Sequence, residues 1–214
     1  MDQKVASTGS RTERKKEDTR LKIISAAMRL FKEHGLDETT MEQIAEETDI
    51  AKGTLYNYFP VKEAIISEYI ERLSQERNSA RIQSLADLPD TRARLTVSLD
   101  ELMAWVQDQS VLFEKYFTYQ VQNMISLRPH QSTANGFHSL GTEIIRLGQK
   151  SAEIRGDLPF DTLIALFEFV FIKVAQRFYQ DPASFNAGEV IGQYVDLFIN
   201  AVKNVPQNGD MHKR

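Results

Sequence analysis

Apolar residues recur at intervals of three and four along most of the chain, which is the spacing of one face of an α-helix. No alternation of polar and apolar residues, the pattern of a half-buried β-strand, extends over any length. We therefore expect an all-α protein. Groups of Gly, Pro and Asp residues interrupt the pattern and favour turns. The pattern predicts a first long helix that Asp18 or Thr19 can cap and that ends near His34, and further helices over 62–82, 91–107, 109–127, 137–153, 161–180 and 189–204.

The pattern over residues 39–59 predicts two shorter helices joined by a tight turn. Thr39 or Thr40 can cap the first of them, because a threonine hydroxyl accepts a hydrogen bond from an unpaired backbone N–H. Glu or Gln three residues later completes a capping box in either register. The second short helix begins near Ala51. The inward apolar face of the pair comprises Met41, Ile44, Ala45, Leu55 and Phe59.

The outward face of the second short helix carries groups that bind nucleic acid. It presents hydroxyl, amide and phenol groups, and no Asp or Glu occurs between Ile50 and Lys62, although the net charge of the whole chain is −4. These groups donate hydrogen bonds to phosphate oxygens and base edges, and none of them repels a polyanion. A helix-turn-helix that places its second helix in the major groove would use this face. A helical hairpin with an ordinary polar exterior is the alternative.

A set of short segments between residues 20 and 66 forms a more specific pattern. The segments are residues 20–27, Leu30-Phe31, Gly35, Thr39-Thr40, Ile44-Ala45, 53–56, Tyr58-Phe59 and 62–65. Together, and without a gap, they resemble the DNA-binding region of the TetR family of bacterial repressors. Tyr58 departs from the family pattern, since many members carry His at this position, but Tyr keeps a hydrogen-bonding tip.

The outward face and the resemblance together define the expected DNA-binding residues. By position in the resemblance, Thr40 and Tyr58 would bind phosphate. Lys62 stands in the first turn of the helix over 62–82, where free N–H groups and the helix dipole also favour a phosphate. Bases would be read by Lys52, Thr54, Tyr56 and Asn57, with Gly53 allowing the backbone to approach closely. The full expected set is Thr40, Met41, Lys52, Gly53, Thr54, Tyr56, Asn57, Tyr58 and Lys62.

Two segments flank this DNA-binding module. At about 1.5 Å per residue, the helix over 62–82 spans about 30 Å, which is long enough to leave the module and join a second domain. Residues 1–18 are polar and include Arg11, Arg14, Lys15 and Lys16, and we expect them to form a disordered basic arm. Such an arm is either a solvated tail or a segment that lies along the DNA backbone or in a minor groove.

The last two predicted helices are apolar around nearly their whole circumference. A helix of this kind must be buried on every side, and the C-terminal helix of a 214-residue chain cannot easily be surrounded by its own domain. We therefore expect a homodimer in which two helices from each subunit form a four-helix contact. The resemblance to TetR proteins implies the same arrangement. The expected interface residues are Phe167, Phe171, Phe178, Tyr194 and Phe198.

The segments between the DNA-binding module and the last helices are rich in aromatic and methionine side chains, which commonly line pockets inside helical bundles. We expect a small apolar effector to bind among them, with plain core packing as the alternative for each residue. The expected pocket residues are Met103, Trp105, Phe113, Phe117, Met124, Phe137, Ile144 and Phe167. Polar specificity stays unassigned among Tyr116, Tyr119, Gln120, Gln122, Asn123 and His138.

Composition and missing motifs narrow the remaining function classes. The chain has no Cys, which rules out disulfides and thiolate metal sites, and its four His residues have no metal-ligand spacing. No run of 18 apolar residues and no signal-peptide pattern occurs, so we expect a cytoplasmic protein without a membrane partner. No phosphate-binding loop, GxSxG motif or nucleophile–base pair is present. We expect no catalytic residue, metal or cofactor.

These observations divide the chain into a basic arm (1–18), a helix-turn-helix DNA-binding domain (19–66), a helical effector-binding and dimerisation domain (67–205) and a tail (206–214). The expected function is ligand-responsive transcriptional regulation, most often repression. The protein would bind a near-palindromic double-stranded operator and leave it when a small apolar effector binds. The alternatives are a DNA-binding adaptor or nucleoid protein with no small-molecule effector, and an all-helical ligand-transforming domain tethered to DNA.

Overall fold

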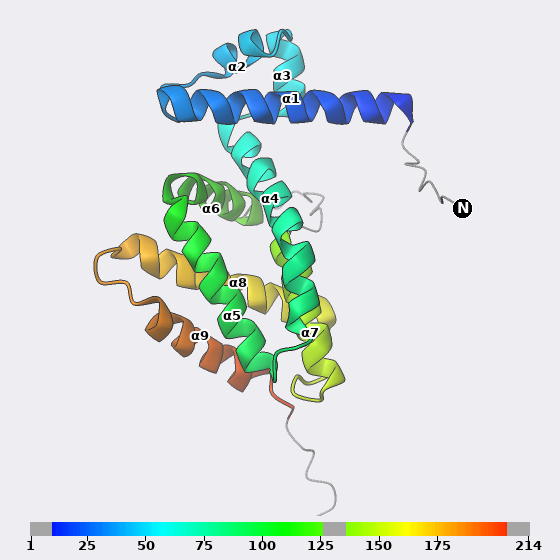
Figure 1. Ribbon diagram of the computed structural model, residues 1–214, viewed down its shortest axis with the longest axis vertical. Helices are drawn as coiled ribbons and strands as arrows, with labels where there is room; N and C mark the ends of the chain where they lie inside the picture. The colour runs from blue at the N-terminus through cyan, green and yellow to red at the C-terminus, as the bar shows by residue number, and fades with distance from the viewer. Residues whose placement is uncertain (1–9, 126–135, 205–214) are drawn as a thin grey trace, which may run out of the picture.

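The computed structural model describes residues 10–125 and 136–204, and all of its named elements are helices. Figure 1 shows a group of three helices at one end and a larger bundle at the other, joined by the long helix α4. The expected all-α fold with these two parts is confirmed. No helix in the described ranges has both the length and the apolar character needed to cross a membrane. The helices are α1 (Arg11–His34), α2 (Met41–Glu47), α3 (Lys52–Tyr58), α4 (Lys62–Leu85), α5 (Thr91–Asp108), α6 (Ser110–Ile125), α7 (Gly136–Lys150), α8 (Phe160–Gln180) and α9 (Ala187–Val202).

The first three helices enclose a small hydrophobic core. Ile23 and Ala27 of α1, Ile44 of α2 and Leu55 of α3 are each 0% exposed. Burial of such side chains is the main favourable term in holding short helices together, because helices of seven residues are marginal by themselves. Ile44 and Leu55 belong to the inward face that the sequence predicts.

α1 begins at Arg11, so the expected start at Asp18 or Thr19 is wrong. Ser10 caps the helix: Ser10 N donates to Glu13 Oε2 at 2.6 Å, and Glu13 N donates to Ser10 Oγ at 3.3 Å. This capping box satisfies the first backbone donors locally, and it lies ahead of the apolar periodicity on which the expected start rests. Residues 11–18 of the expected disordered arm are therefore helical, while residues 1–9 and the expected tail lie outside the described residues.

The bundle is built around α4, which packs against α6 and α7, while α8 contacts both α7 and α9. α7 comes very close to its neighbours at three glycines, Gly136, Gly141 and Gly148. A Cβ added at Gly136 would lie 2.3 Å from Ser74 Cβ, and one added at Gly141 would lie 2.4 Å from the ring of Phe167. Asn78 of α4 also donates to the carbonyl of Gly136. These contacts fix α7 against α4 and α8.

The far end of α4 is anchored by a buried arginine. α4 ends at Leu85, slightly beyond the expected span. Arg94 of α5 is 6% exposed, and its Nε and Nη2 donate to the carbonyl oxygens of Leu85 and Leu88, both at 2.9 Å. Cations are favoured at a helix C-terminus, where carbonyl groups lack partners. The C-terminal end of α4 is therefore anchored in the bundle, and its N-terminal end connects to the group formed by α1, α2 and α3 (Figure 1).

Candidate nucleic-acid interface

Capping and turn geometry hold α2 and α3 as a helix-turn-helix. Gln43 N donates to Thr40 Oγ1 at 3.1 Å, and Thr40 N donates to Gln43 Oε1 at 2.7 Å, which completes a capping box at the start of α2. Thr39, the other expected cap, is buried. In the turn between the helices, Asp49 has φ 52°, a left-handed conformation that Asp tolerates better than most residues.

α3 divides its side chains between the core and the solvent as expected. Leu55 and Phe59, which follows the helix, are buried. A Cβ added at Gly53 would have no described atom within 4 Å. Another molecule can therefore approach this backbone closely. The exposed residues of α3 are Lys52, Gly53, Thr54, Tyr56 and Asn57, and we call them the recognition face. The recognition face presents one ammonium, one hydroxyl, one phenol and one amide to the solvent.

The recognition face has an acidic neighbour that the acid-free stretch of the sequence does not reveal. Lys52 Nζ lies 3.6 Å from Glu42 Oε1 of α2, and the two side chains are 65% and 48% exposed. Exposed ion pairs contribute only about 0–1 kcal/mol. An acceptor group of DNA can therefore replace Glu42 as the partner of Lys52 at little cost.

Two of the expected DNA-binding residues are positioned for other roles. Met41 is 8% exposed and packs in the module core, as its position on the apolar face of α2 requires. Lys62 Nζ donates to the carbonyl oxygens of Leu36, Asp37 and Thr39 at 2.7, 3.4 and 2.7 Å. An ammonium has three N–H donors, and these three carbonyls engage them all. We therefore remove Met41 and Lys62 from the expected DNA contacts.

Thr40 and Tyr58, the expected phosphate ligands, remain accessible to different degrees. Thr40 is exposed, and its hydroxyl accepts the capping hydrogen bond while keeping its own proton to donate. Tyr58 is half-buried, and the Arg20 guanidinium carbon lies 6.0 Å from its ring centroid and 4.9 Å from that of Phe59. These cation–π contacts hold the end of α3 against α1.

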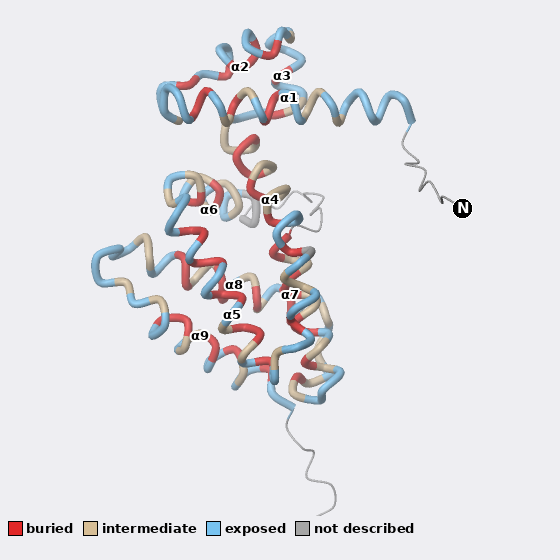
Figure 2. Tube along the Cα trace, viewed as in Figure 1, coloured by how far each residue is buried: buried red, intermediate tan, exposed pale blue. Residues whose placement is uncertain are grey.

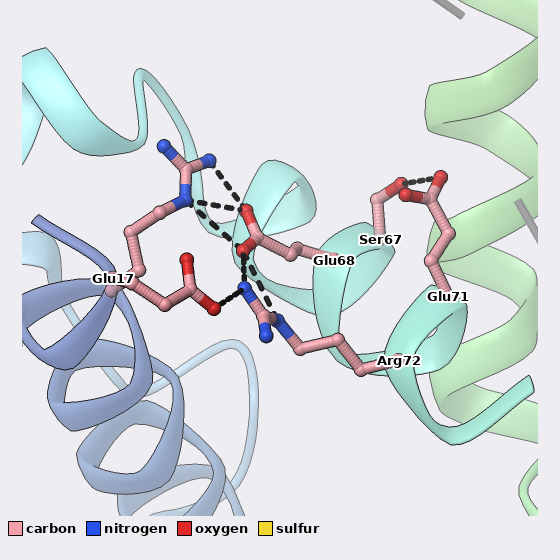
Figure 3. Close-up of polar contacts among 6 residues, drawn as sticks. Glu17, Ser67, Glu68, Glu71 and Arg72 are labelled. Atoms are coloured by element: carbon pink, nitrogen blue, oxygen red, sulfur yellow. Dashed lines mark hydrogen bonds and ion pairs between the residues drawn. The ribbon is translucent and has the colours of Figure 1, made fainter. Parts of the chain in front are cut away.

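An ion-pair network that the sequence analysis does not predict joins α1 to α4 (Figure 3). Glu68 of α4 accepts from Arg20 Nε at 3.0 Å and from Arg72 Nη2 at 2.7 Å. Arg72 Nη2 also lies 2.7 Å from Glu17 Oε1 of α1. Burial opposes ionisation of Glu68, but the hydrogen bonds from Arg20 and Arg72 outweigh it and hold the Glu68 pKa below its ordinary value. Only the i,i+4 spacing of Glu68 and Arg72 is a signal in the sequence.

One turn along α4, a second polar group joins this helix to α6. Glu71 Oε1 accepts from Gln120 Nε2 at 2.9 Å and from Ser67 Oγ at 3.3 Å; Figure 3 shows the Ser67–Glu71 contact. Burial raises the pKa of Glu71, and these two hydrogen bonds offset the rise only in part. α4 therefore carries one carboxylate bound to the DNA-binding module and, beside it, one bound to the bundle.

The structure brings most of the expected pocket residues together. Trp105 and Phe113 meet edge to face with centroids 4.8 Å apart, and Phe137 lies 4.8 Å from Phe171. Phe117 links the two pairs, 5.8 Å from Phe113 and 5.5 Å from Phe171. We call these five rings the aromatic cluster. Met103, Ile144 and Phe167 are also buried in the bundle core. The side chain of Met124 lies outside the described residues.

Three of the expected dimer-interface residues belong to the core of a single subunit. Phe167, Phe171 and Phe198 are 0%, 3% and 1% exposed, because α8 and α9 turn these positions toward the other helices of the bundle. Phe178 and Tyr194 are half-buried. The large apolar side chains that α8 and α9 do expose are Phe169 (49%) and Leu197 (64%). The two helices are therefore covered by their own subunit over most, but not all, of their circumference.

Comparison with known proteins gives matches to both parts of the chain. The family model described as "Bacterial regulatory proteins, tetR family" matches residues 23–69. KstR2 of Rhodococcus jostii (strain RHA1), described as an HTH-type transcriptional repressor, is 24% identical over 200 residues, which cover 90% of this chain and 95% of KstR2.

Two solved structures have the same fold. Thermus thermophilus FadR, a TetR-family transcriptional repressor in complex with lauroyl-CoA, has a TM-score of 0.70 at 23% identity and covers 89% of this chain and 100% of its own. RolR in complex with resorcinol has a TM-score of 0.59 at 20% identity and covers 89% of this chain and 90% of its own. The family match includes all of α2 and α3, with the capped turn and the recognition face described above. The chain belongs to the TetR family of bacterial regulatory proteins and is a DNA-binding transcriptional regulator.

Proposed function

We propose that this chain is a ligand-responsive repressor, which binds operator DNA as a homodimer and leaves it when a small molecule binds in the bundle. The observation that carries the proposal is the recognition face, an exposed set of hydrogen-bonding groups on the second helix of a helix-turn-helix. The description of KstR2 as a repressor supports it. In this proposal residues 19–66 bind DNA, and residues 67–205 bind the effector and the second subunit.

The proposed contacts with DNA follow the exposure of each side chain. Bases would be read by Lys52, Thr54, Tyr56 and Asn57, since these side chains project from α3 into the solvent. Gly53 would allow close approach of α3 to the groove, and Thr40 and Tyr58 would bind phosphates. Two-fold symmetry of the dimer would place two half-sites about 34–36 Å apart, or a multiple of this distance.

The proposed effector has a large apolar part and binds against the aromatic cluster. FadR of Thermus thermophilus is in complex with lauroyl-CoA, and RolR is in complex with resorcinol. Phe113 and Phe117 belong to α6, and Gln120 of the same helix holds Glu71 of α4. An effector that displaces α6 would therefore move α4, whose other polar group binds α1. A coupling of about 1–3 kcal/mol changes operator occupancy about 5- to 150-fold.

The expected result of an effector titration combines two readouts. The operator is first selected from a random duplex library with the wild-type chain, and panels of acyl-CoA esters and phenols are then added. Trp105, the only tryptophan of the chain, belongs to the aromatic cluster, so a true effector should change its emission saturably and release the operator over the same concentrations. Linkage requires the operator to weaken effector binding by the same factor. A compound that binds equally well with and without operator occupies the bundle without regulating it.

The proposed dimer interface uses the exposed side of α8 and α9, centred on Phe169 and Leu197. Pairing these helices with their copies from a second subunit would remove both side chains from water, at about 1.5–3 kcal/mol for each fully buried side chain. A Cβ added at Gly192 of α9 would have no described atom within 4 Å. This small residue would therefore let the partner helix approach closely.

Leu197→Glu is expected to weaken dimerisation at least tenfold, because it places a carboxylate in the proposed contact. Sedimentation over a range of protein concentrations measures the change. Val111→Glu is the matched control, since Val111 is a similarly exposed apolar residue (60%) on α6. A Leu197→Glu protein that is as dimeric as the Val111→Glu protein would place the interface elsewhere. Phe198→Glu is unsuitable for this purpose, because Phe198 lies in the core and its loss would unfold the subunit.

We infer that the protein acts in the cytoplasm on chromosomal DNA, and we propose no catalytic activity and no membrane partner for it. The alternative of a DNA-binding adaptor or nucleoid protein without an effector is not favoured, since relatives of the same fold are in complex with small molecules. The adaptor or nucleoid function would become the favoured one if no compound in the titration released the selected operator.

A further inference from the structure

The first turns of α1 form a basic helical surface that the other described residues leave uncovered. Figures 1 and 2 show these turns extending past α2 and α3 with exposed positions all round. Every residue from 11 to 16 is exposed. This segment contains Arg11, Arg14, Lys15 and Lys16 and the single acid Glu13, so its net charge is +3 in a chain whose net charge is −4.

Two of the three acids on this part of α1, Glu13 and Glu17, have partners, whereas the bases do not. Glu13 accepts from Ser10 N at 2.6 Å in the capping box. Glu17 Oε1 lies 2.7 Å from Arg72 Nη2 of α4. Asp18 is the one exposed acid beside the basic segment. Among the residues that the structure describes, the four basic side chains of 11–16 make no ion pair and no hydrogen bond, so they are available to an anionic partner.

The helical repeat directs two of these bases toward the helix-turn-helix. Arg11, Lys15 and Lys22 are spaced by four and seven residues and share one face of α1. Lys22 Nζ donates to the carbonyl oxygen of Thr48, at the turn between α2 and α3, at 2.6 Å. Glu17 and Arg20 lie on a different face and pair with α4. The face that bears Arg11 and Lys15 therefore continues the side of the molecule that carries the turn.

We propose that Arg11 and Lys15 bind phosphates of duplex DNA beside the segment that α3 reads; the inference rests on the proposed operator binding. An α-helix with its side chains is about 10–12 Å wide, and a minor groove is about 6 Å wide, so this helix meets the phosphate backbone and does not insert into the groove. Residues 11–16 add about 9 Å of helix, which corresponds to about three base pairs.

The test measures operator binding as a function of salt for the wild-type chain and three variants. The operator is selected from a random library with the wild-type chain and is made in a minimal form and in a form with added flanking base pairs. Arg11→Gln/Lys15→Gln removes both charges while keeping good helix formers. Arg14→Gln/Lys16→Gln is the matched control, because it removes the same number of charges from the same turns but from other faces.

The Arg11→Gln/Lys15→Gln protein should lose about two units of salt slope per bound subunit, since each neutralised phosphate contributes about 0.9. It should also lose the gain in affinity that flanking base pairs give the wild-type chain, while its preference for operator over random duplex stays the same. The control should change the slope by less than half as much. A charge-keeping protein, Arg11→Lys/Lys15→Arg, should retain the wild-type slope and serves as the check on folding.

Three results would overturn the proposal. The first is an unchanged slope and flank gain in Arg11→Gln/Lys15→Gln. The second is an equal loss in the matched control, which would mean diffuse attraction by the whole segment. The third is a loss of operator preference, which would assign the two residues to base reading. If the wild-type chain selects no duplex at all, the proposed operator binding itself fails, and this outcome is distinct from the other three.

Discussion

Methionine in place of Lys62 is expected to destabilise the chain by about 3–6 kcal/mol and to leave the salt slope of DNA binding unchanged. The Lys62 ammonium binds three carbonyl oxygens of the segment between α1 and α2. Without it, the part-buried carbonyls of Leu36 and Thr39 lose charged donors, each worth about 1.5–3 kcal/mol. Methionine retains the apolar stem, so the measured loss reports the hydrogen bonds. Urea unfolding followed by circular dichroism measures it.

Lys52→Met is the matched control for Lys62→Met. Lys52 makes only an exposed ion pair with Glu42, so its loss should change stability by less than about 1 kcal/mol. Because Lys52 lies on the recognition face, its loss should instead lower the salt slope by about one. The opposite outcome for Lys62→Met, with normal stability and a slope lower by one, would restore Lys62 as a phosphate ligand. The pair thus separates a structural lysine from a DNA-binding one.

Glu68→Gln and Glu71→Gln, three residues apart on α4, are expected to change stability in opposite directions at neutral pH. Glu68 is ionised between Arg20 and Arg72. Loss of its charge should lower the free energy of unfolding by about 1–3 kcal/mol, which is less than the loss of about 3–5 kcal/mol on breaking a fully buried ion pair. The three side chains are 16%, 29% and 30% exposed. Glu71 is half-buried, and no cation is among its hydrogen-bond partners. Glutamine should therefore stabilise at this position, because it accepts the same hydrogen bonds without a charge.

The same two carboxyl groups predict the pH dependence of stability. The Glu68 pKa is lowered on folding, so its contribution is present above its unfolded pKa and is lost as pH falls through the folded value. The Glu71 pKa is raised on folding, so its contribution is present below its unfolded pKa and is lost as pH rises through the folded value. The free energy of unfolding is measured from acid to neutral pH. In the Glu68→Gln protein it should depend less on pH at the acid end than it does in the wild-type chain. In the Glu71→Gln protein it should be higher than in the wild-type chain at neutral pH. Equal curves for both variants and the wild-type chain would contradict both assignments.

The sequence by itself determined the fold class and the helix-turn-helix, because their signals are local. Helical periodicity, the capping box at Thr40 and Gln43, and the acid-free face of α3 each involve residues a few positions apart. The same local chemistry at Ser10 and Glu13 could have revealed the true start of α1. The expected start followed the apolar periodicity, which begins later.

Only the tertiary structure decided what each side chain contacts. Lys62 has the position of a phosphate ligand, but the path of the chain between α1 and α2 brings three carbonyls to its ammonium. Phe198 lies on a helix that is apolar nearly all round, and only packing shows that it faces its own subunit while Leu197 faces the solvent. Arg20 and Glu68 are 48 residues apart in the sequence, so no local pattern could pair them. Contacts of this kind depend on how helices cross, and helical periodicity carries no information about crossing.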